Sequence, residues 1–594
     1  MQPSRYRILG QIGQGQFGKV FCAVARENGE VFALKDLEMK QFPTHKFLRE
    51  LSYLVSLKHP NIVSFYGLEH HQNGRYLVMD YCEGGTLREL MESGQQLTLQ
   101  LILKLIQDIL SALVHAHRKK IIHCDIKPEN ILLKITPTGY LAKLSDFGIA
   151  KWTEELLQPS QTGGYTGSPA YMAPERFYGK YSAASDLYAV GILFYELLVG
   201  SRPFSGFPKD LMTAHLSKSF DLSDAIPPVL QNIIEKALRK LPQRRFKNSQ
   251  EMLDAVQSAD QELFNHSFNQ PIFVPASFSI LNKSLKIIEQ VYLARPITNL
   301  AVLKNWICWV AENQLIVQTY DDKKDLEFFH NYKISFDDKI IKLEVVDNSV
   351  YIFTFSEKDK VYTLYYFCVE KEQLNKLLTW SASQLISCID PKEEWIAIAV
   401  NLNQLEIYSS PNFELINSLT IQGEIKEIIS FEDVDRLLIN KIENELTVLE
   451  LINFIENKIN VYSIPLSLKL VTLSKSIESE IFAFEENSCY LGLLINLKPL
   501  KISRITLPFN PDFVFAQNWG YILASTLGEV VLLDAKGKIT GQINLKAKIT
   551  AMTILKNEQI LVVVERNHQN LLYQLKIESN FCQKSIIKSM TELS

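Results

Sequence analysis

The spacing of hydrophobic positions changes near residue 264. Before that point, alternating runs over residues 6–35 predict a twisted antiparallel sheet, and apolar residues at helical spacing over residues 45–63 predict an amphipathic helix. After it, Ile, Val, Tyr, Phe and Leu form short alternating runs broken by Asn, Asp, Gly and Lys, which predicts a β-rich region. Residues 264–279 between these regions are polar, contain two prolines and indicate a connector.

The β-rich half contains a repeat. Units with a similar hydrophobic pattern begin at residues 297, 339, 384, 424, 468, 511 and 548. The unit that begins at 339 contains four runs of strand length: 339–346, 350–355, 361–368 and 375–381. Four strands in about 42 residues are typical of one propeller blade. We therefore expect a β-propeller of about seven blades, with residues 285–294 sealing the last blade; a different blade count or a two-sheet β domain are the alternatives.

Composition and charge narrow the class of protein. Hydrophobic residues make up 47% and charged residues 22% of the 594 residues, which excludes a collagen, a long coiled coil or a mostly disordered chain. Residues 1–258 contain 30 Lys and Arg against 25 Asp and Glu, whereas residues 259–594 contain 32 against 41. The net charge of −4 gives no reason to expect a nucleic-acid partner.

The cysteines and the apolar runs bear on the compartment. The eight cysteines are scattered and include no Cys-x-x-Cys pair, which disfavours a disulfide framework and a structural zinc site and fits a reducing compartment. No run of 18 or more apolar residues occurs, and the N-terminus has no apolar run of signal-peptide length. We expect a cytoplasmic protein without a membrane span; the pattern leaves its oligomeric state undefined.

Short motifs follow one another along the first half. The turn with Gly13, Gly15 and Gly18 lets backbone N–H groups approach a phosphate, because no Cβ blocks them. A strand follows this turn, whereas the dinucleotide-binding fingerprint needs a helix there. Downstream come FALK ending at Lys35, the helical Glu50, HCDIKPEN (123–130), SDFG (145–148), SPAYMAPE (168–175) and SDLYAVG (185–191). In this order, the motifs resemble those of eukaryotic-like serine/threonine protein kinases.

The resemblance implies a multidomain chain in which an α+β bilobal kinase fold precedes the propeller. The kinase domain would span residues 1–260, with a small lobe to about residue 80 and a large lobe from about residue 83. A connector would span 261–284 and the propeller 285–594. The propeller resembles the WD-repeat type in its period only, because the Gly-His and Trp-Asp signatures are absent.

The resemblance also implies ATP and Mg²⁺ and assigns roles to residues. Asp125 would accept the proton of the substrate hydroxyl, Lys127 would steady the γ-phosphate, and Asn130 and Asp146 would hold Mg²⁺. Lys35, aimed by Glu50, would contact the α- and β-phosphates. The implied ATP-binding set comprises Ile12, Gly13, Gly15, Gly18, Val20, Ala33, Lys35, Glu50, Met79 as gatekeeper, the backbones of Asp80 and Cys82, and Leu132. Structural roles fall to a Glu175–Arg245 pair and to Asp186, as anchor of the catalytic loop.

One residue departs from the family pattern. Cys124 stands where most regulated kinases have the Arg that binds a phosphorylated activation loop. We therefore expect activity that does not require loop phosphorylation through this route, although Ser160, Thr162 and Thr166 are candidate phosphorylation sites. A buried inert thiol is expected for Cys124 rather than a redox role. Ser168 replaces the Thr whose hydroxyl usually bridges to the catalytic loop, and it retains the hydroxyl.

The predicted function is phosphoryl transfer from ATP to protein Ser or Thr, because Lys127 and the GSPAYMAPE segment resemble serine/threonine rather than tyrosine kinases. The propeller would bind protein substrates or a regulator, since residues 265–594 contain no metal-spaced cluster and no nucleophile motif. Two alternatives remain open: a pseudokinase scaffold, and a kinase that its propeller autoinhibits.

Overall fold

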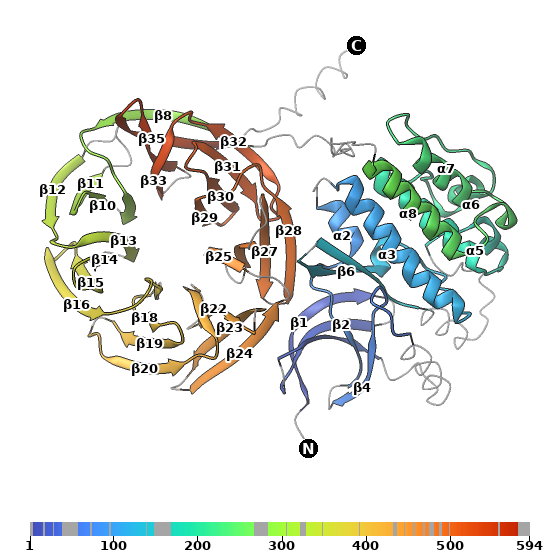
Figure 1. The fold of residues 1–594 in the computed structure, drawn as a ribbon, viewed down its shortest axis with the longest axis horizontal. Coiled ribbons are helices and arrows are strands. Elements are labelled where there is room, and N and C mark those ends of the chain that lie inside the picture. Colours follow the sequence, from blue (N-terminus) through green and yellow to red (C-terminus); the bar gives the residue numbers. More distant parts are fainter. Residues whose placement is uncertain are drawn as a thin grey trace, which may run out of the picture. The chain divides into compact units, whose positions relative to one another are not determined.

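The computed structural model divides into two compact units, residues 1–278 with 496–503 and residues 279–495 with 504–594. In the first, it describes residues 4–15, 18–27, 29–37, 57–71, 74–93, 97–137, 139–147 and 168–265. From residue 283 to residue 579, it describes the chain except residues 304–305, 321–327, 347–348, 391, 411, 432–435, 445, 456–457, 467–469, 475–479, 486–489, 498 and 556–558. Figure 1 shows helices and a small sheet in the first unit and only strands in the second.

The first unit begins with a five-stranded antiparallel sheet, as the alternating pattern predicts. Its strands β1 (Tyr6–Gly15), β2 (Gly18–Ala25), β3 (Val31–Asp36), β4 (Phe65–His71) and β5 (Gly74–Asp80) lie in the order β1-β2-β3-β5-β4. The β1–β2 turn brings Gly15 opposite Gly18, whose φ is 121°. A Cβ on Gly18 would lie 2.5 Å from the carbonyl oxygen of Asp36, so this turn requires glycine.

The rest of this unit is mostly helical. It contains α2 (Leu87–Glu92), α3 (Leu99–Arg118), η1 (Pro128–Asn130), the hairpin β6 (Ile131–Thr136) and β7 (Gly139–Leu144), η2 (Pro169–Tyr171), η3 (Pro174–Tyr178), α5 (Ala183–Val199), α6 (Pro208–Ser217), α7 (Pro228–Ala237), η4 (Pro242–Arg244) and α8 (Ser249–Asn265). The Thr98 side chain caps α3 by accepting a hydrogen bond from the backbone N–H of Leu101. The apolar side of α3 then packs at the centre of the large lobe.

By length and hydropathy alone, α3 meets the criteria for a helix that crosses a membrane. However, 56% of the most hydrophobic stretch of this helix is buried inside the lobe. Ile102, Leu105 and Ile109 are almost fully buried there, while Gln107 bonds Asp260 of α8. This arrangement is that of a core helix.

The described elements shift two predicted boundaries. Helix α8 ends at Asn265, close to the predicted change of pattern near residue 264 but five residues inside the connector predicted over residues 261–284; its buried apolar residues continue to Ala259. Strand β8 begins at Lys283, two residues before the predicted start of the propeller. Residues 266–282, most of the predicted connector, lie outside the described residues.

The described residues of the β-rich half form seven four-stranded sheets. The first three contain β9 (Asn299–Leu303), β10 (Trp306–Ala311), β11 (Gln314–Tyr320), β12 (Phe328–Ser335); β13 (Lys339–Val346), β14 (Ser349–Ser356), β15 (Val361–Cys368), β16 (Gln373–Trp380); and β17 (Ser387–Ile389), β18 (Trp395–Asn401), β19 (Gln404–Ser409), β20 (Leu415–Thr420). The next two contain β21 (Glu424–Ser430), β22 (Arg436–Glu443), β23 (Leu446–Ile455), β24 (Lys458–Leu466); and β25 (Leu470–Ser474), β26 (Glu480–Glu485), β27 (Leu491–Leu497), β28 (Leu500–Thr506). The last two contain β29 (Phe513–Gln517), β30 (Gly520–Ala524), β31 (Glu529–Asp534), β32 (Ile539–Asn544); and β33 (Lys548–Leu555), β34 (Gln559–Arg566), β35 (Gln569–Ser579), β8 (Lys283–Leu293).

The repeat predicted from the sequence coincides with these sheets. Each of the seven repeat starts lies within three residues of the first residue of β9, β13, β17, β21, β25, β29 or β33. The seventh sheet is completed by β8, which pairs with β35, as expected for residues 285–294. Apolar side chains join neighbouring sheets: Ile307 of the first sheet, for example, shares a buried cluster with Leu561 of the seventh. Figure 1 shows the sheets side by side around a common centre.

A buried histidine gives the first unit a predicted pH dependence. His215 of α6 is fully buried against the rings of Tyr188 and Phe204, and its Nδ1 lies 2.9 Å from the Tyr188 hydroxyl. Burial, followed by the charge of Lys240, lowers the pKa of His215 from 6.5 to about 4. Because the folded state resists protonation, stability is full above the unfolded pKa and is lost as the pH falls from about 6.5 towards 4.

We therefore expect His215 to remove about 2 kcal/mol of stability between pH 7 and pH 5. Urea unfolding at the two pH values measures this loss, and the His215→Gln variant, which cannot titrate, is the reference. A variant whose stability falls with pH as steeply as that of the wild type would contradict the assignment.

Candidate active site

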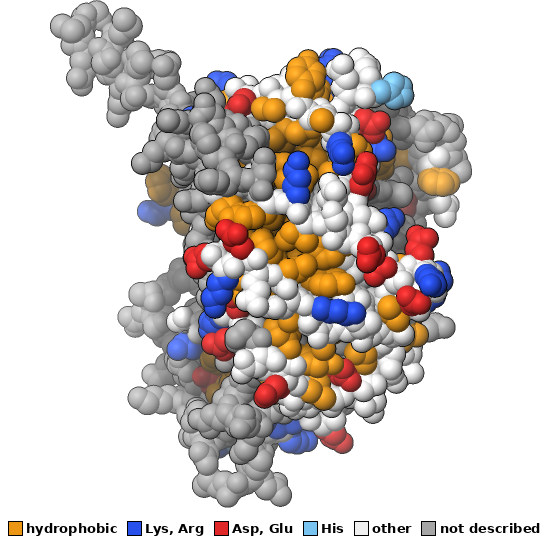
Figure 2. All heavy atoms as spheres, turned by 90° about the vertical axis from the view of Figure 1, so that its left-hand side faces the viewer, with side chains coloured by type: hydrophobic (Ala, Val, Ile, Leu, Met, Phe, Trp, Pro, Cys, Tyr) orange, Lys and Arg blue, Asp and Glu red, His pale blue; other side chains and the backbone are white. Residues whose placement is uncertain are grey.

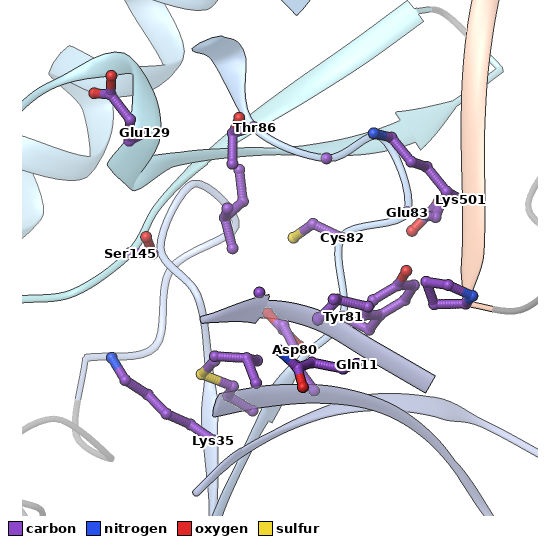
Figure 3. Close-up of a pocket in the computed structure, with 18 of the residues that line it drawn as sticks. Gln11, Lys35, Asp80, Tyr81, Cys82, Glu83, Thr86, Glu129, Ser145 and Lys501 are labelled. Carbon is purple, nitrogen blue, oxygen red and sulfur yellow. The ribbon is translucent and has the colours of Figure 1, made fainter. Parts of the chain in front are cut away.

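A pocket between the sheet and the helical part of the first unit gathers most of the predicted nucleotide-binding residues. Its lining includes Ile12, Gly13, Gly18, Val20, Ala33, Lys35, Met79, Asp80, Cys82, Leu132 and Asp146. Figure 3 shows how Lys35 reaches it from the sheet, while Glu129 and Ser145 lie toward the helical side. Gly15 is not among the lining residues, although Gly18, with which it pairs, is. Glu50, predicted to aim Lys35, lies outside the described residues.

Asp80, the last residue of β5, and the segment that follows it form one wall of the pocket. The Asp80 carboxylate accepts from Lys143 at 2.7 Å and from the Tyr66 hydroxyl at 2.8 Å. Burial alone would raise the pKa of Asp80, but the hydrogen bond and charge of Lys143, together with the bonds from the Ser64 N–H and the Tyr66 hydroxyl, outweigh it and lower the pKa. Burial raises the pKa of the Cys82 thiol to about 12, so this thiol is unreactive at neutral pH. That the backbones of Asp80 and Cys82 face the adenine edge stays a prediction.

Several lining residues were not predicted. They are Gln11, Gln14, Tyr81, Glu83, Gly85, Thr86, Glu89, Glu129 and Ser145, together with Pro499 and Lys501 from residues 496–503, which belong to this unit. Most are sequence neighbours of predicted residues, and Ser145 directly precedes Asp146. In the sequence, the only indication that such a residue lines the pocket is that it is adjacent to a motif. Which of the adjacent residues face the pocket depends on the path of the backbone.

Lys35 and Asp146 meet at the inner end of the pocket. The Lys35 Nζ lies 2.7 Å from Oδ1 of Asp146; 8% of the lysine side chain is exposed, against 39% of the aspartate. Asp146 has a left-handed backbone, with φ of 58°. Its accessible carboxylate and the amide oxygen of Asn130 are hard oxygen donors, which suit Mg²⁺ because that ion retains water and takes few protein ligands. The donor set therefore fits a magnesium ion.

The catalytic loop holds Asp125 in a polar network. Oδ2 of Asp125 lies 2.8 Å from Lys127 Nζ and accepts from Nδ2 of Asn130 at 2.9 Å. The backbone N–H of Ser168 lies 3.3 Å from Oδ1. Burial alone raises the pKa of a carboxyl, but the hydrogen bond and charge of Lys127 outweigh it, so the pKa of Asp125 is lowered. Asp125 is therefore ionised at neutral pH.

Buried charges fix this loop from beneath. Asp186 of α5 accepts from the backbone N–H groups of His123 at 2.9 Å and Cys124 at 3.0 Å, which confirms its predicted role as anchor. The Glu175–Arg245 pair is also confirmed: both guanidinium nitrogens lie 2.7 Å from the two carboxylate oxygens, and the Arg245 side chain has no exposed surface.

Cys124 adopts a left-handed backbone, with φ of 69°, which is strained for a residue with a Cβ. Its carbonyl accepts from the Arg176 guanidinium, and its thiol lies 3.7 Å from the carbonyl oxygen of Ile122. A cysteine side chain carries no positive charge, so residue 124 itself cannot form an ion pair with a phosphate group. The phosphorylation candidates Ser160, Thr162 and Thr166 lie outside the described residues, and the hydroxyl role of Ser168 stays a prediction.

Comparisons with known proteins agree with this site. Residues 6–258 match the family described as protein kinase domain. The chain is 31% identical over 292 residues to the probable serine/threonine-protein kinase PknB of Lactococcus lactis, which covers 46% of each protein. It is 33% identical over 301 residues to serine/threonine-protein kinase PrkC of Bacillus subtilis, covering 49% of this chain and 45% of that protein. The chain thus spans less than half the length of these two relatives.

A third relative is covered almost completely. The chain is 33% identical over 251 residues to Aurora kinase C of Mus musculus, which covers 41% of this chain and 88% of that protein. The protein kinase family typically uses ATP and Mg²⁺. The lysine, the aspartates and the catalytic loop lie around one pocket, and the sequence matches agree with this arrangement. This chain therefore belongs to the protein kinase family and is similar within it to serine/threonine kinases.

Proposed function

We propose that this chain is a serine/threonine protein kinase that transfers the γ-phosphate of ATP to a protein Ser or Thr hydroxyl. The observation that carries this proposal is the ionised Asp125 carboxylate, bonded to both Lys127 and Asn130. A pseudokinase scaffold, the rival function, would need no such carboxylate aimed by two partners. The lowered pKa of Asp125 favours a group that receives a proton only as the hydroxyl attacks.

Each residue then has one task. Asp125 orients the substrate hydroxyl and takes its proton, while Lys127, 2.8 Å away, supplies positive charge to the transferred group. Lys35 binds the phosphates that remain on the nucleotide. Asn130 and Asp146 would hold Mg²⁺, which neutralises phosphate charge when it is bound. The apolar residues Ile12, Val20, Ala33 and Leu132 would enclose the adenine, with Met79 as gatekeeper and the Asp80 and Cys82 backbones at its edge.

Transfer of labelled γ-phosphate from ATP to a generic protein substrate by the full chain tests this function. The Asp146→Asn variant is the control, since losing one proposed metal ligand is expected to lower transfer by about 10³-fold or more. Absence of transfer by the wild type, with ATP binding intact, would favour the pseudokinase scaffold.

Activity is expected to be independent of activation-loop phosphorylation, because Cys124 offers no cation to a phosphorylated loop. Phosphatase treatment of the full chain should therefore leave the rate of phosphoryl transfer within about a factor of three of the untreated rate, a change of the size of one exposed ion pair. Loss of activity on treatment, together with its return on replacing Thr166 by Glu, would overturn this prediction.

We infer that the β-rich half is a propeller of seven blades that binds protein substrates or a regulator of the kinase. Seven four-stranded sheets, the repeat period and the shared cluster between the first and seventh sheets support the ring. Among its described residues, no group of three His, Cys, Asp or Glu side chains could hold a metal ion, which favours a binding role over catalysis. A cytoplasmic location belongs to the same proposal.

The surface of this half supports a protein partner rather than a nucleic acid. Figure 2 shows hydrophobic side chains interspersed with charges of both signs on the face that it presents. Large exposed apolar residues occur on outer strands, among them Ile287, Ile288 and Tyr292 on β8 and Leu415 and Ile416 on β20. No continuous basic surface of the kind that binds a phosphate backbone is visible on this face.

Two experiments separate the roles proposed for the propeller. Capture of proteins by residues 279–594, followed by their phosphorylation by the full chain, would support recruitment. Comparison of the full chain with residues 1–265 tests autoinhibition, which predicts that truncation raises transfer to a generic substrate.

A further inference from the structure

Two acidic side chains of the first unit converge on one arginine beside the catalytic loop. Arg88, in α2, places Nε 2.9 Å from Oε1 of Glu129 and NH1 3.1 Å from Oε1 of Glu196. Its NH2 donates to the Tyr171 hydroxyl at 2.5 Å, and this hydroxyl donates in turn to Oε2 of Glu196. Glu196 and Tyr171 are almost fully buried, at 5% and 4% exposure, whereas Glu129 is about half exposed.

This cluster is close to Asp125 along two segments of the chain. Glu129 is in the catalytic loop, four residues after Asp125. Ser168, whose N–H contacts the Asp125 carboxylate, begins the segment that ends three residues later at Tyr171. A peptide that offers its hydroxyl to Asp125 extends about 3.3 Å per residue, so a side chain a few residues from the acceptor reaches this cluster.

The charges of the cluster are already satisfied within the chain. Burial opposes the charge of Arg88, but the bond to Glu129 and the neighbouring Tyr171 and Glu196 outweigh it and raise its pKa. The guanidinium fork uses Nε, NH1 and NH2 on three different partners. The remaining acidic neighbour, Glu92, is mostly exposed and 3.8 Å from Nε, so water screens it.

We propose that Arg88 is a specificity-determining residue: it occupies, from within the chain, the acidic subsite formed by Glu129 and Glu196, so that the kinase does not select a basic residue there. A substrate Arg or Lys finds its carboxylate partners already bonded. Removal of the guanidinium would open the subsite to a cationic substrate side chain, which could form the same charge-assisted bonds. This inference rests on the proposed kinase function.

Position-scanned peptides test it on the full chain. Each peptide has one Ser in an Ala background, with a single Arg placed up to about four residues on either side of the acceptor, a reach of about 13 Å. For the wild type, kcat/KM should change by no more than about threefold at any position, as for exposed ion pairs. For Arg88→Ala, it should rise by about 10- to 100-fold at one position, as expected for a hydrogen bond between charged groups.

Matched variants fix the interpretation. In Arg88→Ala with Glu129→Gln, the gain at that position should shrink or vanish. Arg118→Ala, which removes an exposed arginine bonded to Gln250 through NH2 at 3.1 Å, should leave every ratio unchanged. Arg88→Ala leaves Glu196 buried without its cation, and this variant could fail to fold. In that case the double variant Arg88→Ala with Glu196→Gln replaces it. Glu129 is then the only carboxylate left in the subsite, so kcat/KM should rise at the same position by a smaller factor.

The outcomes are distinct. A wild type that already favours Arg at one position, and loses that preference in Glu129→Gln, would overturn the proposal. An equal fall on all peptides in Arg88→Ala would show that Arg88 only supports the fold. A full chain that phosphorylates no peptide and no generic protein would instead refute the kinase function on which the proposal rests.

Discussion

Replacing Asp125 by Asn is expected to lower the rate of phosphoryl transfer by about 10²–10⁴-fold, the contribution of a positioned general base. Asn is nearly the same size, but it cannot accept the hydroxyl proton and it removes the charge that Lys127 faces at 2.8 Å. Because Asp125 is not among the residues that line the nucleotide pocket, the KM for ATP should change little. Steady-state rates at varied ATP, with a fixed protein substrate, measure both quantities.

The matched control is Asp254→Asn on α8, where an exposed carboxylate accepts from Gln250 at 2.8 Å. The same chemical change there should leave the transfer rate unaltered. Equal rates for Asp125→Asn and the wild type would remove Asp125 from the mechanism, and the lowered pKa of this residue would then need another explanation.

Replacing Arg245 by Met is expected to destabilise the first unit by about 3–5 kcal/mol, because it leaves Glu175 buried without its cation. The Glu175 carboxylate keeps only the Ser185 hydroxyl, at 2.8 Å, as a side-chain donor. Burial alone raises the pKa of Glu175, but the hydrogen bond and charge of Arg245, together with a backbone hydrogen bond and the bond from Ser185, outweigh it and lower the pKa. Without Arg245, the effect of burial on this pKa should prevail. Urea unfolding of the full chain measures the loss of unfolding free energy, from the unfolding transition that moves to a lower urea concentration.

An exposed pair of equal length supplies the comparison. Lys236 and Glu251 are also 2.7 Å apart, but their side chains are 43% and 36% exposed. Lys236→Met should therefore cost no more than about 1 kcal/mol. If the two substitutions cost the same, burial would not be what makes the Glu175–Arg245 pair important. Removing both charges, in Arg245→Met with Glu175→Gln, should restore part of the loss.

Regular patterns made much of the fold predictable. The repeat starts coincide with the first strands of the seven sheets because each unit repeats the same succession of apolar runs. The second strands β14 and β34, for example, are buried at most of their residues and keep continuous apolar runs. The outer strands are more exposed; residues 373–380 of β16 were placed two residues late because their polar positions blur the alternation. The end of α8 agrees with the predicted change of pattern near residue 264, whereas the predicted domain boundary at residue 260 falls inside this helix, whose last described residues have little buried surface.

The candidate site was predictable to the extent that chemistry lies in contiguous motifs. Asp125, Lys127 and Asn130 share one loop, so their spacing in the sequence indicates their role. The Arg88–Glu196 contact joins residues 108 apart and arises only when α2 packs beside α5. No local pattern indicates such a pair, because its partners are selected by tertiary packing.

Strand β8 has a consequence for the order in which the chain acquires structure during synthesis. It pairs with β35, and the Lys286–Glu578 ion pair joins residues 292 apart in the sequence. Closing a loop of that length costs about 5 kcal/mol of chain entropy. β8 therefore leaves the ribosome long before its partner strand is synthesised. In the meantime its edge is unpaired and the Ile287 and Ile288 side chains are exposed. Until β35 is synthesised, the unpaired edge of β8 is a site at which the nascent protein can aggregate or bind a chaperone.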